Sequence, residues 1–469
     1  MSILPVSGPS GTLVTINGTL FGDPQGTSLV YFQPANGPPV SAGPASLWTD
    51  SQIQVHVPAG LPSEMVSLFV DKGGVLSNPM SFTVTGALPG VPQITAITPT
   101  SGNPLTEVVI SGSGFGNIEG TVLFGGSPGP VESWTDTEIR VFPPNFAGSS
   151  TLQVQVANGA GAGNGVSFDY LAQYSASIWV PGLTSPWAIA MDQSAWGIFV
   201  AYGSATYEIK KYDTTTQNTL IGSWTTISGS GNCYGLAVEP SSGNLFFSTA
   251  NAAPYKIVEY NSGGTAQVGY GLLQQSPPES GAYGAGVALD SSGGVWVCDQ
   301  TNGAVEKYTW DGSNFVIANQ ATDWLLGFST SPNGGPFGVA ADNRPGAGYI
   351  YITDTSMNEV EKYLANGTFM GTLISGANAP AVPRAITVAE SGHILVTQTT
   401  AADLRIKIYE PDGSLVKEIP MDPSWFWMSL GGIAVDKLGN IYAVHTGGAV
   451  WKLTPSASAS WPIPVRQRR

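Results

Sequence analysis

Charged residues are scarce in this chain of 469 residues: only 10% are Asp, Glu, Lys or Arg, and acidic residues outnumber basic ones by 32 to 17. Phosphates of nucleic acids and anionic membrane surfaces attract clustered Lys and Arg, so a net charge of −15 argues against both kinds of partner. No apolar run approaches the roughly 18–20 residues that span a bilayer. The sequence therefore predicts a soluble globular protein with no nucleic-acid partner and no membrane span.

Cysteine and histidine are also rare, which limits disulfide and metal chemistry. The two cysteines, Cys233 and Cys298, are too few for a disulfide scaffold and form no Cys-x-x-Cys zinc pattern. Two buried free thiols are favoured for them, with a bridge between blades as the alternative. The three histidines, His56, His393 and His445, form no pair at metal-ligand spacing. The N-terminus shows no basic segment, apolar stretch or cleavage site, so no signal peptide is visible.

Glycine and proline, by contrast, are abundant, with 60 and 35 copies, while 42% of the residues are hydrophobic. Gly and Pro interrupt helices, so this content argues against a helical protein. The apolar share is too high for a disordered low-complexity chain. Both observations favour an all-β fold with many tight turns.

One series of motifs occurs twice in the first 170 residues. It consists of Pro-x-Ser-Gly, Gly-x-x-Phe-Gly and Trp-Thr-Asp-x-x-Ile, found at 5–8, 18–22 and 48–53 and again at 99–102, 112–116 and 134–139. Alternating apolar residues between Gly, Pro and Asn turns are typical of half-buried strands. The series resembles the IPT/TIG family of Ig-like domains. That resemblance implies two tandem Ig-like β-sandwiches, over residues 1–86 and 93–171.

Residues 176–458 repeat with a shorter period. Equivalent positions 192, 239, 290, 342, 389 and 436 are separated by 47, 51, 52, 47 and 47 residues. Each unit holds apolar strands with Gly turns, and most first strands carry a small residue, as crowding at an axis requires. Six such units predict a six-bladed β-propeller, and the pattern resembles the NHL type. We expect residues 177–180 to supply the last missing strand and close the ring, with 459–469 as a C-terminal tail.

This topology gathers side chains from all blades on one face. The start of each first strand and the end of each second strand lie on the same side of a propeller, where the chain offers aromatic rings, carboxylates, one Arg and one His. Such a mixture suits stacking on sugar rings or gripping a peptide loop. The alternative is that these residues pack between blades and cap turns. The predicted ligand-binding face comprises Trp187, Tyr202, Tyr234, Tyr283, Asp299, Phe337, Asp354, Arg384, Gln398 and His445.

Two other groups of residues allow more than one interpretation. Acidic residues recur before the turn of five blades and are interpreted as turn caps rather than as catalytic groups; they are Asp192, Glu239, Asp290, Asp342 and Asp436. A cluster of Trp425, Phe426 and Trp427 precedes the last blade. If exposed it is an interface for a partner, and if buried it plugs a blade junction.

These features favour a non-catalytic, surface-exposed binding or adhesion protein, whose Ig-like modules act as spacer or anchor and whose propeller face engages a glycan or protein. An extracellular location follows, either as a phage virion component (tail fibre, decoration or receptor-binding protein) or as a secreted bacterial protein, with other virion or cell-surface subunits as further partners.

Two alternatives stay open. One is a propeller enzyme, a lyase or a calcium-dependent hydrolase, acting at Asp299, Asp354, Arg384 and His445; the other is a purely structural assembly subunit. The resemblance implies several His ligands for NHL-like lyases, which three histidines do not provide. Asp299 and Asp354 alone are a weak calcium pair. We therefore expect no catalytic residues and no cofactor, with Ca²⁺ as a minor alternative.

Overall fold

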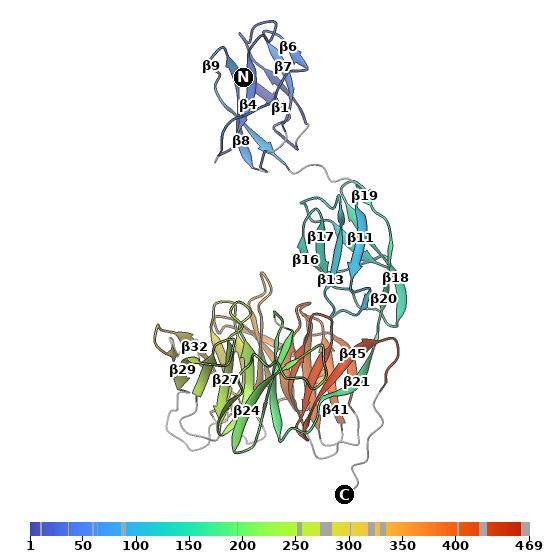
Figure 1. Ribbon diagram of the computed structural model, residues 1–469, viewed down its shortest axis with the longest axis vertical. Helices are drawn as coiled ribbons and strands as arrows, with labels where there is room; N and C mark the ends of the chain where they lie inside the picture. Colours follow the sequence, from blue (N-terminus) through green and yellow to red (C-terminus); the bar gives the residue numbers. More distant parts are fainter. Residues whose placement is uncertain are drawn as a thin grey trace. The chain divides into compact units, whose positions relative to one another are not determined.

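In the computed structural model of the chain, nearly all of the regular secondary structure of the described residues is β-strand (Figure 1), which confirms the all-β fold. It describes residues 1–9, 12–35, 37–58, 61–62, 64–85, 91–194, 196–250, 256–272, 284–300, 302–317, 324–328, 334–400, 403–421 and 429–460. Within these ranges the single helical element is a 3-10 turn, η1 (Gly376–Asn378). No helix there has the length and apolar character that a membrane crossing requires.

The first repeat is a sandwich of two sheets. One sheet has the order β1 (Ser2–Leu4), β3 (Leu13–Asn17), β7 (Gln52–His56) and β6 (Leu47–Trp48). The other has the order β2 (Ser7–Gly8), β10 (Met80–Val84), β8 (Met65–Lys72), β4 (Leu29–Gln33) and β5 (Val40–Ser41), with β9 (Val75–Leu76) beside β8. Alternate residues of each long strand face inward, so that Val30, Phe32 and Phe82 are buried in the core between the sheets.

The second repeat has the same strand order. Its first sheet runs β11 (Gln93–Thr98), β13 (Val108–Ser113), β17 (Glu138–Val141) and β16 (Val131–Trp134). Its second sheet runs β12 (Ser101–Gly102), β20 (Val166–Tyr170), β18 (Ser150–Asn158), β14 (Thr121–Phe124) and β15 (Ser127–Pro128), with β19 (Gly161–Ala162) beside β18. The prediction of two Ig-like sandwiches is confirmed.

Hydrogen bonds explain why the motifs recur together. Asp50 Oδ1 accepts the backbone N–H of Gly22 at 2.9 Å, and in the second sandwich Asp136 Oδ1 accepts that of Gly116 at 2.8 Å. Both glycines have positive φ, +85° and +80°, a conformation that side chains disfavour. Trp134 also donates its indole N–H to Gly116 O at 2.9 Å. The Phe-Gly turn and the Trp-Thr-Asp segment are thus two halves of one local structure.

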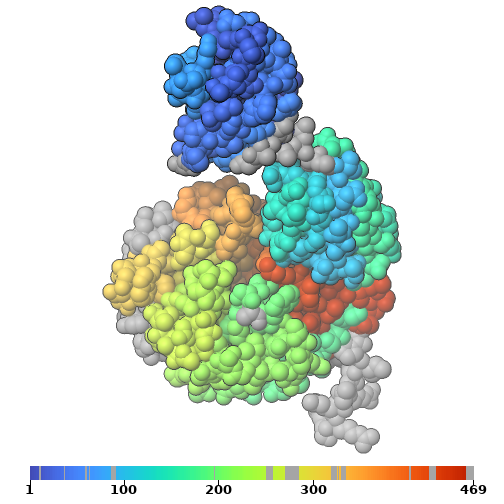
Figure 2. Space-filling view, turned by 45° about the horizontal axis from the view of Figure 1, so that its top comes forward, coloured from blue at the N-terminus to red at the C-terminus, as the bar shows by residue number. Residues whose placement is uncertain are grey.

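The rest of the chain forms six antiparallel sheets, which follow one another around a ring (Figures 1 and 2). In chain order the first three are β22 (Pro186–Asp192), β23 (Gly197–Tyr202), β24 (Thr206–Asp213), β25 (Ile227–Ser230); β26 (Asn232–Val238), β27 (Leu245–Ala250), β28 (Lys256–Tyr260), β29 (Gln267–Leu272); and β30 (Gly284–Leu289), β31 (Val295–Asp299), β32 (Ala304–Trp310), β33 (Phe315–Val316), with β34 (Trp324–Leu326) beside β32.

The remaining three sheets complete the ring. They are β35 (Pro336–Asp342), β36 (Tyr349–Asp354), β37 (Glu359–Leu364), β38 (Phe369–Ile374); β39 (Pro383–Val388), β40 (Ile394–Thr400), β41 (Asp403–Tyr409), β42 (Leu415–Pro420); and β43 (Leu430–Val435), β44 (Ile441–His445), β45 (Ala449–Ser456), β21 (Gln173–Val180). Strand β21 pairs antiparallel with β45, so the start of the propeller completes the sheet formed by its end. The predicted closure by residues 177–180 is confirmed.

The innermost strands β22, β26, β30, β35, β39 and β43 surround the axis, and each contacts the innermost strands of both neighbours. Little space separates them. A Cβ atom on Gly235 would lie 2.2 Å from Ala285 O, and one on Gly338 would lie 2.3 Å from Arg384 O. The glycine in the first strand of these blades is therefore required by close approach of neighbouring backbones.

The recurring acids cap the turns after the innermost strands, as expected. Asp290 Oδ1 accepts the backbone N–H groups of Ser292 and Gly294, both at 2.9 Å, and Asp436 Oδ1 accepts that of Asn440 at 2.9 Å. The acids lie at the opposite strand ends from the predicted ligand face. They therefore stabilise turns and do not belong to that face.

Both cysteines are buried free thiols. Burial raises the pKa of each thiol well above its usual range. Cys298 occupies the position that Ser248 and Thr353 hold in the neighbouring blades. The hydroxyl groups of Ser248 and Thr353 each donate a hydrogen bond to a backbone carbonyl in the innermost strand of the following blade. The favoured interpretation of unbridged thiols is confirmed.

Candidate functional site

The ends of the first two strands of the blades meet at one end of the axial channel. The pairs in register are Pro186 with Tyr202, Cys233 with Thr249, Gly284 with Asp299, Pro336 with Asp354, Pro383 with Gln398, and Leu430 with His445. The repeat alone predicted that strand starts and second-strand ends share one face, and the registers confirm it. The two sets of residues nevertheless differ in their surroundings.

Four residues at the strand starts, Trp187, Tyr234, Phe337 and Arg384, form what we call the mouth ring. All four side chains are partly buried and keep some exposure to solvent. The rings of Trp187 and Tyr234 meet edge to face, with centroids 5.1 Å apart and planes at 89°. The Arg384 guanidinium lies over the Phe337 ring, with Cζ 5.0 Å from the centroid. Two neighbouring pairs of blades thus each supply an aromatic surface to the mouth.

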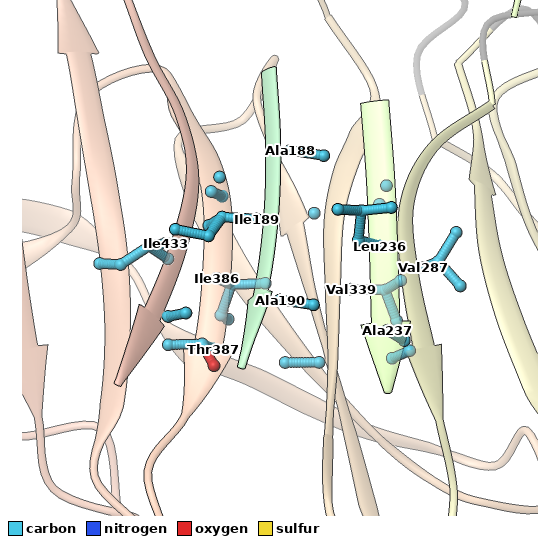
Figure 3. A pocket seen from close by; sticks show the side chains of 18 of the residues that line it. Ala188, Ile189, Ala190, Leu236, Ala237, Val287, Val339, Ile386, Thr387 and Ile433 are labelled. Carbon is cyan, nitrogen blue, oxygen red and sulfur yellow. The ribbon is translucent and has the colours of Figure 1, made fainter. Parts of the chain in front are cut away.

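Behind the mouth ring lies a channel of about 250 Å³, which Tyr234 and Phe337 also line. Figure 3 shows apolar side chains of several blades, such as Ile189, Leu236 and Val339, around this channel. Its walls carry one branched apolar residue from each blade: Ile189, Leu236, Val287, Val339, Ile386 and Ile433. Ca²⁺ prefers carboxylate and carbonyl oxygens, so these hydrocarbon side chains are a poor ligand set for an axial calcium ion. Among the described residues, no group of three or more Asp, Glu, His or Cys side chains is placed so that it could hold a metal ion.

Arg384 is the positive charge of the mouth ring, and its side chain is partly buried. Burial lowers the pKa of its guanidinium, and the nearby Tyr234 phenol acts in the opposite direction. Tyr234 belongs to the second blade and Arg384 to the fifth. Among the described residues, no hydrogen-bond acceptor contacts the buried Nε of Arg384.

The two predicted carboxylates of the face are turn caps. Asp299 is fully buried and accepts both the backbone N–H of Asn302 at 3.1 Å and its side-chain amide at 2.7 Å. Asp354 is also buried, and its Oδ1 accepts the backbone N–H of Ser356 at 2.8 Å and its hydroxyl at 2.6 Å. Both carboxylates are engaged within their own blades rather than directed to the mouth.

The other predicted second-strand ends are likewise engaged within blades. The Tyr202 hydroxyl donates to Glu208, and the Gln398 amide donates to Asp403 at 2.9 Å. His445 is buried, and this burial lowers its pKa to about 4, so it is neutral at pH 7. The remaining predicted residues, Tyr283 and the cluster Trp425, Phe426 and Trp427, lie outside the described residues.

Sequence reasoning missed two features. The buried Asn232 donates a side-chain amide N–H to the Tyr234 hydroxyl at 2.6 Å and so fixes one member of the mouth ring. The signal in the sequence is that Asn232 lies two residues before Tyr234 in the same strand, and alternate residues of a strand point to the same side of a sheet. A second cavity, of about 390 Å³, lies within the compact unit of residues 99–108, 142–152 and 167–469, and Tyr174, His393 and Glu410 line it. Its lining comes from segments far apart in sequence, so no local pattern indicates it.

Glu306, close to Asp299, makes the stability of the third blade depend on pH. Its side chain is fully buried; burial raises its pKa to about 8 against the hydrogen bond from Tyr308, and the charge of Asp299 raises it further. The pKa of Glu306 is higher in the folded than in the unfolded chain. The contribution of the protonated carboxyl group to the free energy of unfolding is therefore complete below about pH 4.3 and is lost as pH rises towards about 8. We expect the free energy of unfolding, measured by urea titration, to fall between pH 5 and 8 more steeply in the wild type than in Glu306→Gln. Equal slopes would contradict a neutral buried Glu306.

Comparison with known proteins assigns the two sandwiches. The family model of the IPT/TIG domain matches residues 1–84 and 92–170, so both sandwiches are IPT/TIG domains. A cyclomaltodextrin glucanotransferase of Niallia circulans is 36% identical over 126 residues, which cover 24% of this chain and 17% of that protein. One of Paenibacillus macerans is 33% identical over 135 residues, covering 24% and 18%. The chain thus spans less than a fifth of the length of these relatives.

A solved structure resembles a larger part of the chain. A structural genomics protein of unknown function from Bacteroides thetaiotaomicron aligns with a TM-score of 0.51 and 16% identity, covering 78% of this chain and 98% of that one. At this identity the likeness concerns the fold alone.

Proposed function

We propose that this chain is a non-catalytic, surface-exposed binding protein with an NHL-type propeller, which holds a glycan at the mouth ring while the IPT/TIG domains act as spacer or anchor. The observation that carries the proposal is the placement of Trp187, Tyr234 and Phe337, all partly exposed, around one end of the channel. Blades from different parts of the ring converge there, as the closed topology requires.

Sugar rings suit this surface because their C–H faces are apolar and flat, while their hydroxyl groups need hydrogen-bond partners. Aromatic rings provide the apolar contact, and the Tyr234 hydroxyl and Arg384 guanidinium provide polar contacts at its rim. The innermost strands pair on one side only, so their second row of backbone N–H and C=O groups faces the channel. A glycan end that enters the channel mouth would find donors and acceptors there.

The environment of the other face residues supports binding rather than catalysis. General acid–base chemistry needs groups that reach the substrate, whereas Asp299 and Asp354 accept hydrogen bonds from their own turns and His445 is buried and neutral at pH 7. The enzymatic alternative relied on these three residues together with Arg384. Only Arg384 belongs to the mouth ring.

The relatives guide the choice of glycans to test. Cyclomaltodextrin glucanotransferases are named for a glucan, and their resemblance to this chain is confined to about a quarter of it. Cyclomaltodextrins and linear glucans therefore belong in the panel of glycans tested.

We place the protein outside the cell, as a secreted bacterial protein or a phage virion component, with cell-surface or virion subunits as its neighbours.

A glycan array followed by titration of the ligands it identifies tests the proposal. We expect Trp187→Ala and Phe337→Ala each to weaken binding by about tenfold, since loss of one aromatic contact costs about 1.4 kcal/mol. Trp310→Ala is the matched control, because Trp310 is 46% exposed on the outer strand β32, away from the mouth. Unchanged affinity in both mouth variants, or an equal loss in Trp310→Ala, would reject the mouth ring as the binding site.

A further inference from the structure

Arg384 differs from the other arginines of the propeller in having no acidic partner among the described residues. Arg344 and Arg405 each pair with a nearby aspartate, Asp342 and Asp403, at 2.8 Å. Arg384 instead lies over an aromatic ring, largely buried, and its Nε reaches neither solvent nor an acceptor within the described part of the chain. The mouth ring thus contains a partly buried cation that has no acidic partner among the described residues, and whose Nε is buried without an acceptor there.

Such a cation is costly to bury and is stabilised by an anion of suitable shape. A guanidinium presents a planar fork of N–H donors that matches the two oxygens of a carboxylate, and a desolvated site strengthens the pair. The Phe337 ring beneath the guanidinium limits the directions that these donors take. The chain as a whole carries a net charge of −15, so long-range attraction does not favour acidic ligands. Any preference for an anion at the mouth must therefore come from this local group.

We propose that the mouth ring selects acidic glycans, with Arg384 binding the carboxylate of a uronic or sialic acid unit while the aromatic rings contact its sugar ring. This inference rests on the proposed glycan-binding function and adds the class of ligand. Arg384 is then the specificity-determining residue, and Trp187 and Phe337 supply contacts that acidic and neutral sugars share.

Paired ligands that differ only in the acidic group test this with the full-length chain. Trigalacturonic acid is compared with its carboxyl-reduced counterpart, and 3′-sialyllactose with its methyl ester, by calorimetric titration at constant ionic strength. We expect the acidic member to bind at least about tenfold more tightly, the range of a charge-assisted hydrogen bond. Arg384→Gln should abolish the preference and retain the weaker binding of the neutral member, whereas Arg384→Lys should retain part of the preference.

The control Arg140→Gln removes the same charge from an exposed pair with Glu138 in the second sandwich, and should leave the preference unchanged. Thermal denaturation provides a second readout: Arg384→Gln should unfold at a temperature no lower than the wild type, because it removes a buried charge without a partner. Equal affinities within each pair, or a preference that survives in Arg384→Gln, would overturn the inference and leave the proposed function intact. If no glycan binds, acidic or neutral, the proposed function is itself wrong and the inference falls with it.

Discussion

Replacing Asp290 by alanine is expected to destabilise the propeller by about 3–5 kcal/mol, the usual cost of breaking a buried ion pair from one side. Asp290 and Lys307 contact each other at 2.8 Å, with side chains 2% and 11% exposed. Asp290 also accepts the indole N–H of Trp296 at 2.9 Å and caps its own turn. The variant leaves the buried Lys307 ammonium group without its carboxylate, although it keeps its hydrogen bond to Ala365 O, and leaves a buried indole donor without its acceptor. Urea denaturation followed by tryptophan fluorescence measures the loss.

Two further variants show whether the charge causes this loss. The double variant Asp290→Ala/Lys307→Met should recover part of the stability, because the uncompensated ammonium group is gone. Glu239→Ala changes the equivalent position of the second blade, where the carboxylate accepts the hydroxyl of Ser242 and forms no ion pair among the described residues; it should cost less than about 1 kcal/mol. Equal losses in Asp290→Ala and Glu239→Ala would contradict the account.

The same ion pair predicts how stability responds to acid. Although burial acts to raise it, the pKa of Asp290 is lowered by Lys307, Ser292 and Trp296. A pKa lower in the folded than in the unfolded chain means stabilisation that is present at neutral pH and lost as pH falls through the acidic range. The pH dependence of the Asp290 contribution has the opposite sign to that of Glu306. We therefore expect the free energy of unfolding of the wild type to pass through a maximum, because it falls towards acidic pH as Asp290 is protonated and falls towards higher pH as the Glu306 contribution is lost.

Gly338→Val is expected to destabilise the propeller by about 3 kcal/mol, at the upper end of what overpacking costs. A Cβ atom there would lie 2.3 Å from Arg384 O and 3.0 Å from Ile386 Cγ2, so the fifth blade's innermost strand must move. Because that strand carries Arg384 into the mouth ring, the variant should also weaken ligand binding. Thermal denaturation and glycan titration of one sample measure both effects.

Gly222→Ala is the matched control for this steric argument. No atom lies within 4 Å of a Cβ built on Gly222, and its φ is not in the left-handed region. We therefore expect no loss of stability, and a gain of up to about 0.4–1 kcal/mol from reduced freedom of the unfolded chain. A loss in Gly222→Ala comparable to that in Gly338→Val would mean that close approach at the axis is not the cause.

Much of the fold could be predicted from the sequence because repetition reports topology directly. Equivalent residues such as Asp290 and Asp436 recur at a nearly constant interval and cap equivalent turns, which fixes the blade boundaries. The missing last strand followed from the unpaired edge that the last unit would otherwise leave. The structure supplies it as β21, paired with β45.

The site was predicted less well, for a physical reason. The blade repeat places Trp187 and Asp354 on the same face, but it does not report what each side chain contacts. A short polar side chain before a turn, such as Asp354 before Ser356, bonds to the nearest backbone amides and is withdrawn from the surface. The large rings at the strand starts, Trp187, Tyr234 and Phe337, are only partly buried and keep some exposure to solvent at the mouth. The predicted face therefore separates into partly exposed aromatic rings and buried turn caps.

The most direct measurement is a crystal structure of the full chain with an oligosaccharide identified on the array. The account predicts a sugar ring packed against Trp187 or Phe337 at the mouth of the channel, with polar contacts to the Tyr234 hydroxyl and Arg384. Electron density for the sugar on an IPT/TIG domain or on the outer edge of a blade, with the mouth ring free of ligand, would contradict it.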